Sequence, residues 1–83
     1  MEEEQVGMLL LREAHFARVS AQRYEALAQL ARQHADLSSA WVCELNRTEE
    51  QDRARELFAL AEGAAQAAAE ANASSVAAAP ADS

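Results

Sequence analysis

Residues Leu27 to Leu45 read LAQLARQHADLSSAWVCEL and carry the clearest periodic pattern in the chain. Their large side chains recur every three or four residues, which places them on one face of an α-helix. This apolar stripe consists of Leu27, Leu30, His34, Leu37, Trp41 and Leu45. The flanking sequence is rich in Ala, Leu, Glu, Gln and Arg, the strongest helix formers, and has no useful apolar/polar alternation. The sequence therefore predicts an all-α protein.

The strongest helix-start signal lies just after the stripe. Thr48 and Gln51 have the spacing of a capping box, and the acidic residues after Thr48 suit the positive end of a helix dipole. This signal predicts a first helix from about Glu4 to about Leu45 and a turn within residues 45–49. The second helix should then run from about Glu49 to about Ala71.

A competing start signal lies inside the stripe. Asp36, together with Ser38 and Ser39, has the residue types of a helix N-cap, so a new helix could begin there. We favour one continuous first helix, because the apolar stripe passes through these residues in phase.

A turn this short makes the two helices antiparallel. The predicted fold is an antiparallel helical hairpin over residues 1–71, with a long first helix, a shorter second helix and coiled-coil-like packing. Residues 72–83 are rich in Ala, Ser and Pro and are predicted to be a disordered tail. The predicted core consists of Leu27, Leu30, Leu37, Trp41, Leu45, Leu57, Phe58 and Leu60.

The amino-terminal half of the first helix lies beyond the reach of the predicted second helix. Residues 8–11 are consecutive large apolar residues, so they point to all sides of a helix and need cover on several sides. We therefore predict that residues 6–19 dock into another protein chain. The predicted partner-binding residues are Val6, Met8, Leu9, Leu10, Leu11, Phe16, Val19 and Tyr24.

Size and charge limit the classes of partner. A chain of 83 residues buries a thin core, and its single cysteine excludes an internal disulfide, so association with another chain is expected. The net charge is −7 and the seven basic residues, all arginines, are scattered, which disfavours nucleic acids and anionic membranes. In phase, the stripe extends backwards through Tyr24, Phe16, Leu9 and Val6. Polar interruptions of this extension at Glu13, Ser20 and Arg23 favour a hetero-oligomer over a homodimer. The lone Cys43 and the lack of a membrane-spanning apolar run predict a cytoplasmic, reducing environment.

Candidate chemical sites are weak in this sequence. His15 and His34 lie far apart and have no His or Cys one turn away, so no metal site is expected. Cys43 has no catalytic motif around it, and we expect a small buried or half-buried residue there. No phosphate-binding loop is present, so no catalytic residues, cofactor or small-molecule substrate are predicted.

Two non-enzymatic functions fit these features. The first is an adaptor or structural subunit of a multi-protein assembly. The second is a small acidic chaperone or co-chaperone that holds an amphipathic helix of a client. In size, acidity and helicity the chain broadly resembles the co-chaperones of bacterial type III secretion needles, although it shares no motif with them. A symmetric coiled-coil dimer is a further possibility that the polar interruptions weaken.

Overall fold

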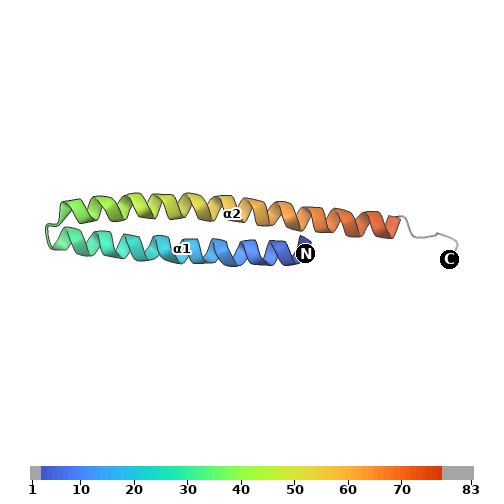
Figure 1. Cartoon of the computed structure of the whole chain (residues 1–83), viewed down its shortest axis with the longest axis horizontal. Coiled ribbons are helices and arrows are strands. Elements are labelled where there is room, and N and C mark those ends of the chain that lie inside the picture. Colours follow the sequence, from blue (N-terminus) through green and yellow to red (C-terminus); the bar gives the residue numbers. More distant parts are fainter. Residues whose placement is uncertain (1–2, 78–83) are drawn as a thin grey trace.

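The computed structural model describes residues 3–77 of the chain. These residues form two α-helices, α1 (Glu3–Gln33) and α2 (Leu37–Ala77), which pack side by side in antiparallel orientation (Figure 1). The predicted all-α antiparallel hairpin is therefore confirmed.

The position of the turn differs from the prediction. It lies at residues 34–36, so the predicted turn within residues 45–49 is wrong. α1 has 31 residues and α2 has 41, which reverses the predicted long first helix and shorter second helix. As a result, α2 runs along α1 from Arg32, which pairs with Glu44, to Gly7, which lies beside Ala64.

α1 ends in a Schellman motif at Ala35. The amide of Asp36 donates to the carbonyl of Ala31 (2.8 Å), and the amide of Ala35 donates to the carbonyl of Arg32 (3.0 Å). Ala35 has a φ of 58°, in the left-handed region that helix ends usually fill with glycine. Alanine is the best helix former, so the sequence at Ala35 predicts that the helix continues rather than ends.

Asp36 begins α2 as its N-cap. Its carboxylate accepts hydrogen bonds from the amide of Ser39 (Oδ1, 3.1 Å) and from the hydroxyl of Ser39 (Oδ2, 2.7 Å), and its carbonyl accepts from the amide of Ala40 (3.1 Å). The Ser39 hydroxyl, followed by the Ser39 amide, holds the pKa of Asp36 below its ordinary value, because both bonds favour the charged carboxylate. The competing start signal at Asp36 and Ser39 is thus the one that the chain uses.

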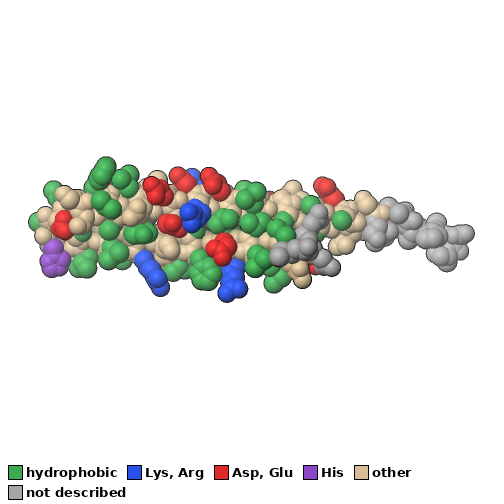
Figure 2. Space-filling view, viewed as in Figure 1, with side chains coloured by type: hydrophobic (Ala, Val, Ile, Leu, Met, Phe, Trp, Pro, Cys, Tyr) green, Lys and Arg blue, Asp and Glu red, His purple; other side chains and the backbone are tan. Residues whose placement is uncertain are grey.

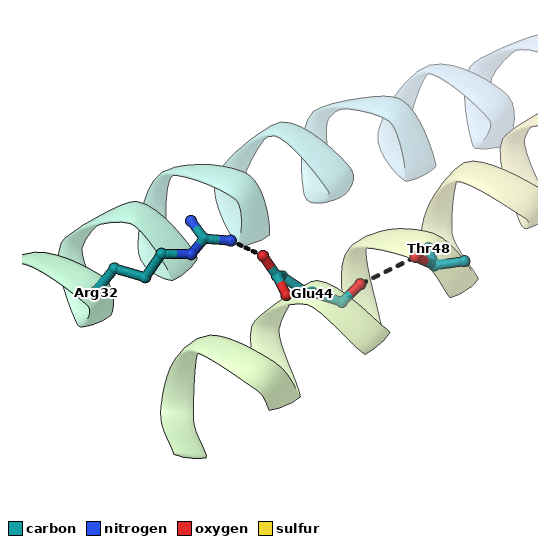
Figure 3. A network of polar contacts seen from close by, with 3 residues as sticks. All are labelled: Arg32, Glu44 and Thr48. Carbon is teal, nitrogen blue, oxygen red and sulfur yellow. Dashed lines mark hydrogen bonds and ion pairs between the residues drawn. The ribbon is translucent and has the colours of Figure 1, made fainter. Parts of the chain in front are cut away.

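Thr48 lies inside α2 and does not cap a helix. Its hydroxyl donates to the carbonyl of Glu44 one turn earlier (3.1 Å), a bond that helical threonines make within a continuous helix (Figure 3). The carboxylate of the same Glu44 pairs with Arg32 of α1 and joins the two helices near the turn (Figure 3). Asn46, Arg47 and Thr48 are at most mildly unfavourable in a helix, so the capping pattern does not interrupt α2.

The seam between α1 and α2 is built from small residues. Every buried residue in the described part of the chain is glycine or alanine. On α1 the buried residues recur every seven positions, at Gly7, Ala14, Ala21 and Ala28, with Ala17 between them. On α2 they are Ala40, Ala54 and Ala61. This heptad spacing is that of a coiled coil, and the small side chains allow the two backbones to approach closely.

The predicted core of large side chains is wrong. Most of its members are exposed, namely Leu27, Leu30, Leu37, Trp41, Leu45 and Leu60. Only Leu57 and Phe58 are half-buried. The turn at residues 34–36 cuts the apolar stripe in two, and the alanine positions of each helix, rather than the leucine positions, face the partner helix.

α2 continues past the predicted end of the hairpin. It reaches Ala77, so the predicted disorder is wrong for residues 72–77. Extending an existing helix through alanine-rich sequence costs little, whereas starting a new one is expensive. Residues 78–83 of the predicted tail lie outside the described residues.

Candidate docking surface

Large apolar side chains lie on the outside of the hairpin. They are Met8, Leu9, Leu11, Phe16, Val19, Leu27, Leu30, Leu37, Trp41, Val42, Leu45 and Leu60. Figure 2 shows hydrophobic side chains distributed along the face in view, with acidic and basic side chains between them. A single exposed leucine is ordinary in a soluble protein. A set this extensive, around an interior of alanine and glycine, marks a candidate interaction surface.

The predicted partner-binding residues divide into two groups. Val6, Leu10 and Tyr24 are half-buried in the described hairpin. The exposed members are Met8, Leu9, Leu11, Phe16 and Val19. The expectation that residues 6–19 lie beyond the reach of the second helix is wrong, because α2 covers one side of this segment. A Cβ atom at Gly7 would lie only 3.7 Å from the Cβ of Ala64.

Helical spacing assigns the exposed residues of this segment to different flanks of α1. Leu9 and Phe16 are seven residues apart and share one flank. Met8 and Leu11 are three residues apart, and both face a groove between α1 and α2. The consecutive apolar run therefore contributes both to the groove and to a part of the α1 surface outside the groove.

The groove beside Met8 and Leu11 has a mainly apolar lining. Its volume is about 330 Å³. Its apolar lining consists of Gly7, Met8 and Leu11 of α1 and of Ala61, Ala65, Ala68 and Ala69 of α2. Gly7 and Ala61 are the buried members of this lining. Among the described residues that line it, Glu4 is the only charged one. The small side chains of α2 leave this space open because they extend little beyond the helix backbone.

A polar and aromatic segment lies farther toward the turn. The rings of His15 and Phe58 meet edge to face with their centroids 5.6 Å apart, and the guanidinium carbon of Arg18 lies 4.7 Å from the centroid of Phe58. Beyond them is a second groove of about 360 Å³ with a polar lining. Its lining includes Arg18, Gln22, Glu25, Gln51 and Arg55. The apolar groove is therefore confined to the end of the hairpin opposite the turn.

A further apolar surface lies next to the turn. Leu37, Trp41 and Val42 line a shallow hollow together with Ser38, and Trp41 is 63% exposed. The sequence-based prediction placed Leu37 and Trp41 in the core and so missed this surface. The N-cap at Asp36 is the signal that reveals it, because it places these residues in the first turns of α2, at one end of the hairpin.

Cys43 is a free thiol and is half-buried, which agrees with the burial predicted for it. Within residues 3–77, no three His, Cys, Asp or Glu side chains are grouped so as to hold a metal ion. Neither described helix combines the length and apolar character needed to cross a membrane. The exposed aliphatic and aromatic side chains, with charges between them, suit contact with another polypeptide.

Comparison of the chain with protein-family models, curated proteins and solved structures found no match.

Proposed function

We propose that this chain is a non-enzymatic helical interaction protein, an adaptor or structural subunit of a multi-protein assembly, which docks through the apolar amino-terminal half of α1. The observation that carries the proposal is the distribution of side chains by size. Alanine and glycine fill the seam, while Met8, Leu9, Leu11 and Phe16 lie outside it. Full burial of one such large side chain is worth roughly 1.5–3 kcal/mol, so a partner that covers several of them gains substantial affinity.

The partner in this proposal is a different protein chain. Two copies of this chain would each bring a net charge of −7, which opposes self-association. The same charge and the scattered arginines disfavour nucleic acids and anionic membranes as partners. The lone cysteine supports a reducing, intracellular location.

The second candidate function is a small acidic chaperone or co-chaperone. The open apolar groove beside Met8 and Leu11 favours it, because such a groove suits an amphipathic helix of a client protein. An adaptor keeps its partner in the finished assembly, whereas a chaperone releases its client. The persistence of the complex therefore separates the two functions.

The experiment compares the wild-type chain with Leu9→Asp/Phe16→Asp, a double variant whose two sites are exposed on one flank of α1. The matched control is Ala26→Asp/Ala59→Asp, which adds the same charge at exposed alanines. Each protein is expressed in its source cells, captured by affinity, and analysed by light scattering and by mass spectrometry of co-purified chains. Circular dichroism checks that both variants stay helical.

We expect the wild type and the control to co-purify with the same partner, and the Leu9→Asp/Phe16→Asp variant to lose it while staying helical. A buried unpaired carboxylate is costly, so the interface should not tolerate two. A wild-type chain that purifies as a stable monomer without a partner would refute the proposal.

A further inference from the structure

The groove beside Met8 and Leu11 points to the chemistry of its occupant, and this inference rests on the proposed function. We propose that the groove binds an amphipathic helix of another protein, whose apolar stripe of aliphatic side chains is flanked by lysine or arginine. The lining is an elongated strip contributed by two antiparallel helices, which is the shape that a third helix fills.

The lining of the groove suits aliphatic side chains. It consists of alanines from α2 and of Gly7, Met8 and Leu11 from α1. Met8 is 72% exposed and Leu11 is 42% exposed, so both retain surface for an occupant to cover. An occupant that presents residues at positions i, i+3, i+4 and i+7 places its apolar stripe along this strip.

The charge around the groove favours a basic occupant. Glu4 is the only charged residue among the described residues that line it. Helical spacing places Glu62 of α2 beside Ala65 and Ala69, and Arg12 of α1 one turn beyond Met8, so the two carboxylates outnumber the one cation around the groove. Each nearby carboxylate attracts a cation at the edge of a bound helix. A second copy of this chain would bring further negative charge to the same rim, so the charges favour a basic partner over self-association.

The end of the hairpin leaves room for such a helix. Figure 1 shows α2 continuing past the amino end of the described part of α1. The lining of the groove extends to Asn72, beside Glu4. A bound helix can therefore follow α2 past Glu4 without meeting another described segment of the chain.

The test uses three labelled peptides of about 18 residues, long enough for about five helical turns. The first carries a Leu/Ala stripe flanked by lysines, the second carries the same stripe flanked by glutamates, and the third has the composition of the first in scrambled order. Binding to the full chain is measured by fluorescence anisotropy at two salt concentrations. Amide chemical shifts of the isotope-labelled chain locate the site.

We expect the lysine-flanked peptide to bind more tightly than the other two and to shift amides of residues 4–11 and 61–72. Leu11→Gln should weaken binding about tenfold, because it removes an apolar wall of the groove. Leu45→Gln is the matched control, because Leu45 is 45% exposed and lies outside the groove. This variant should bind the lysine-flanked peptide with the affinity of the wild type. Glu4→Gln should weaken binding and reduce its salt dependence.

Several results would overturn this inference. The first is that the glutamate-flanked peptide binds as tightly as the lysine-flanked one, and the second is that the lysine-flanked peptide does not bind. The others are amide chemical-shift changes centred on Leu37 to Val42, and dimerisation of the chain through the groove. Its failure is distinguishable from failure of the proposed function. A native partner that is lost with Leu9→Asp/Phe16→Asp and kept with Leu11→Gln would leave the interaction protein in place and exclude the groove as its docking site.

Discussion

The substitution Ala35→Gly tests the position of the turn, because the turn position decides whether the substitution raises or lowers the free energy of unfolding. In the structure, Ala35 is the residue between α1 and α2 that adopts a left-handed backbone conformation, with a φ of 58°. That conformation costs a non-glycine residue roughly 1–2 kcal/mol, and glycine adopts it without this cost. Glycine also gives the unfolded chain more freedom, which lowers stability by roughly 0.4–1 kcal/mol. The difference predicts that Ala35→Gly raises the free energy of unfolding by about 0.5–1 kcal/mol.

The measurement is urea and thermal unfolding followed by far-ultraviolet circular dichroism. For a domain of this size, the gain corresponds to a rise in Tm of about 2–8 °C. Ala26→Gly is the control, because Ala26 is exposed inside α1, and it should lower stability by about 1 kcal/mol. Asn46→Gly probes the alternative turn and should lower stability by a few tenths of a kcal/mol, because Asn46 lies inside α2.

The opposite pattern would refute the reasoning. If the turn lay within residues 45–49, Ala35 would be inside a helix and Ala35→Gly would cost about 1 kcal/mol. Asn46→Gly would then be neutral or stabilising. A stabilising Ala35→Gly together with a destabilising Asn46→Gly is compatible only with a turn at residues 34–36.

Three further predictions concern the seam, the surface and the cap. Gly7→Ala and Gly63→Ala should each raise the free energy of unfolding in urea by up to about 1 kcal/mol. A Cβ at Gly7 would meet Ala64 at an ordinary 3.7 Å, and one at Gly63 would meet nothing within 4 Å. A lower stability of Gly7→Ala would show that the helices pack more closely there. Trp41→Ala should lower the free energy of unfolding of the isolated chain by about 1 kcal/mol or less, because Trp41 is 63% exposed, whereas loss of a buried ring costs about 3–5 kcal/mol. Blue-shifted indole fluorescence that is protected from quenchers in the isolated chain would contradict this. Because the pKa of Asp36 is lowered, its charged form stabilises the hairpin above the ordinary carboxyl pKa, and this contribution is lost as the pH falls through the lowered value. Asp36→Asn can still cap α2 but does not titrate, so a pH series of urea midpoints should show a smaller loss of stability at acid pH than the wild type shows. An unchanged pH profile would count against the cap.

Composition and periodicity were sufficient to predict the fold class. Strong helix formers fill the chain, and an antiparallel pair is the simplest way for two connected helices of this length to pack. The turn was mispredicted because a capping box at Thr48 is a stronger sequence pattern than an alanine that ends a helix. The N-cap residues Asp36 and Ser39 were visible in the sequence, but the stop before them was not, since Ala35 adopts a conformation that the sequence rules assign to glycine.

The buried face of each helix was mispredicted for a related reason. The leucine stripe has the correct helical period, but periodicity alone does not say whether a face meets another helix or solvent. A second period, of small residues at Gly7, Ala14, Ala21 and Ala28, was also present in the sequence, and it forms the seam. The prediction places large side chains in the core, whereas this hairpin packs alanine and glycine between its two helices.

The choice of alanine for the seam has a consequence for the whole surface. An alanine buries much less apolar area than a leucine, so the described hairpin gains little from its interior relative to the entropy of ordering its residues. Large side chains such as Met8, Phe16 and Trp41 keep more than half of their exposure, so hydrophobic stabilisation that their burial would supply is still unused in the isolated chain. Any partner that covers these side chains adds its binding free energy to the stability of the fold. The residues proposed to bind a partner are therefore the same ones whose burial would complete a hydrophobic core, so we expect binding and folding to be coupled.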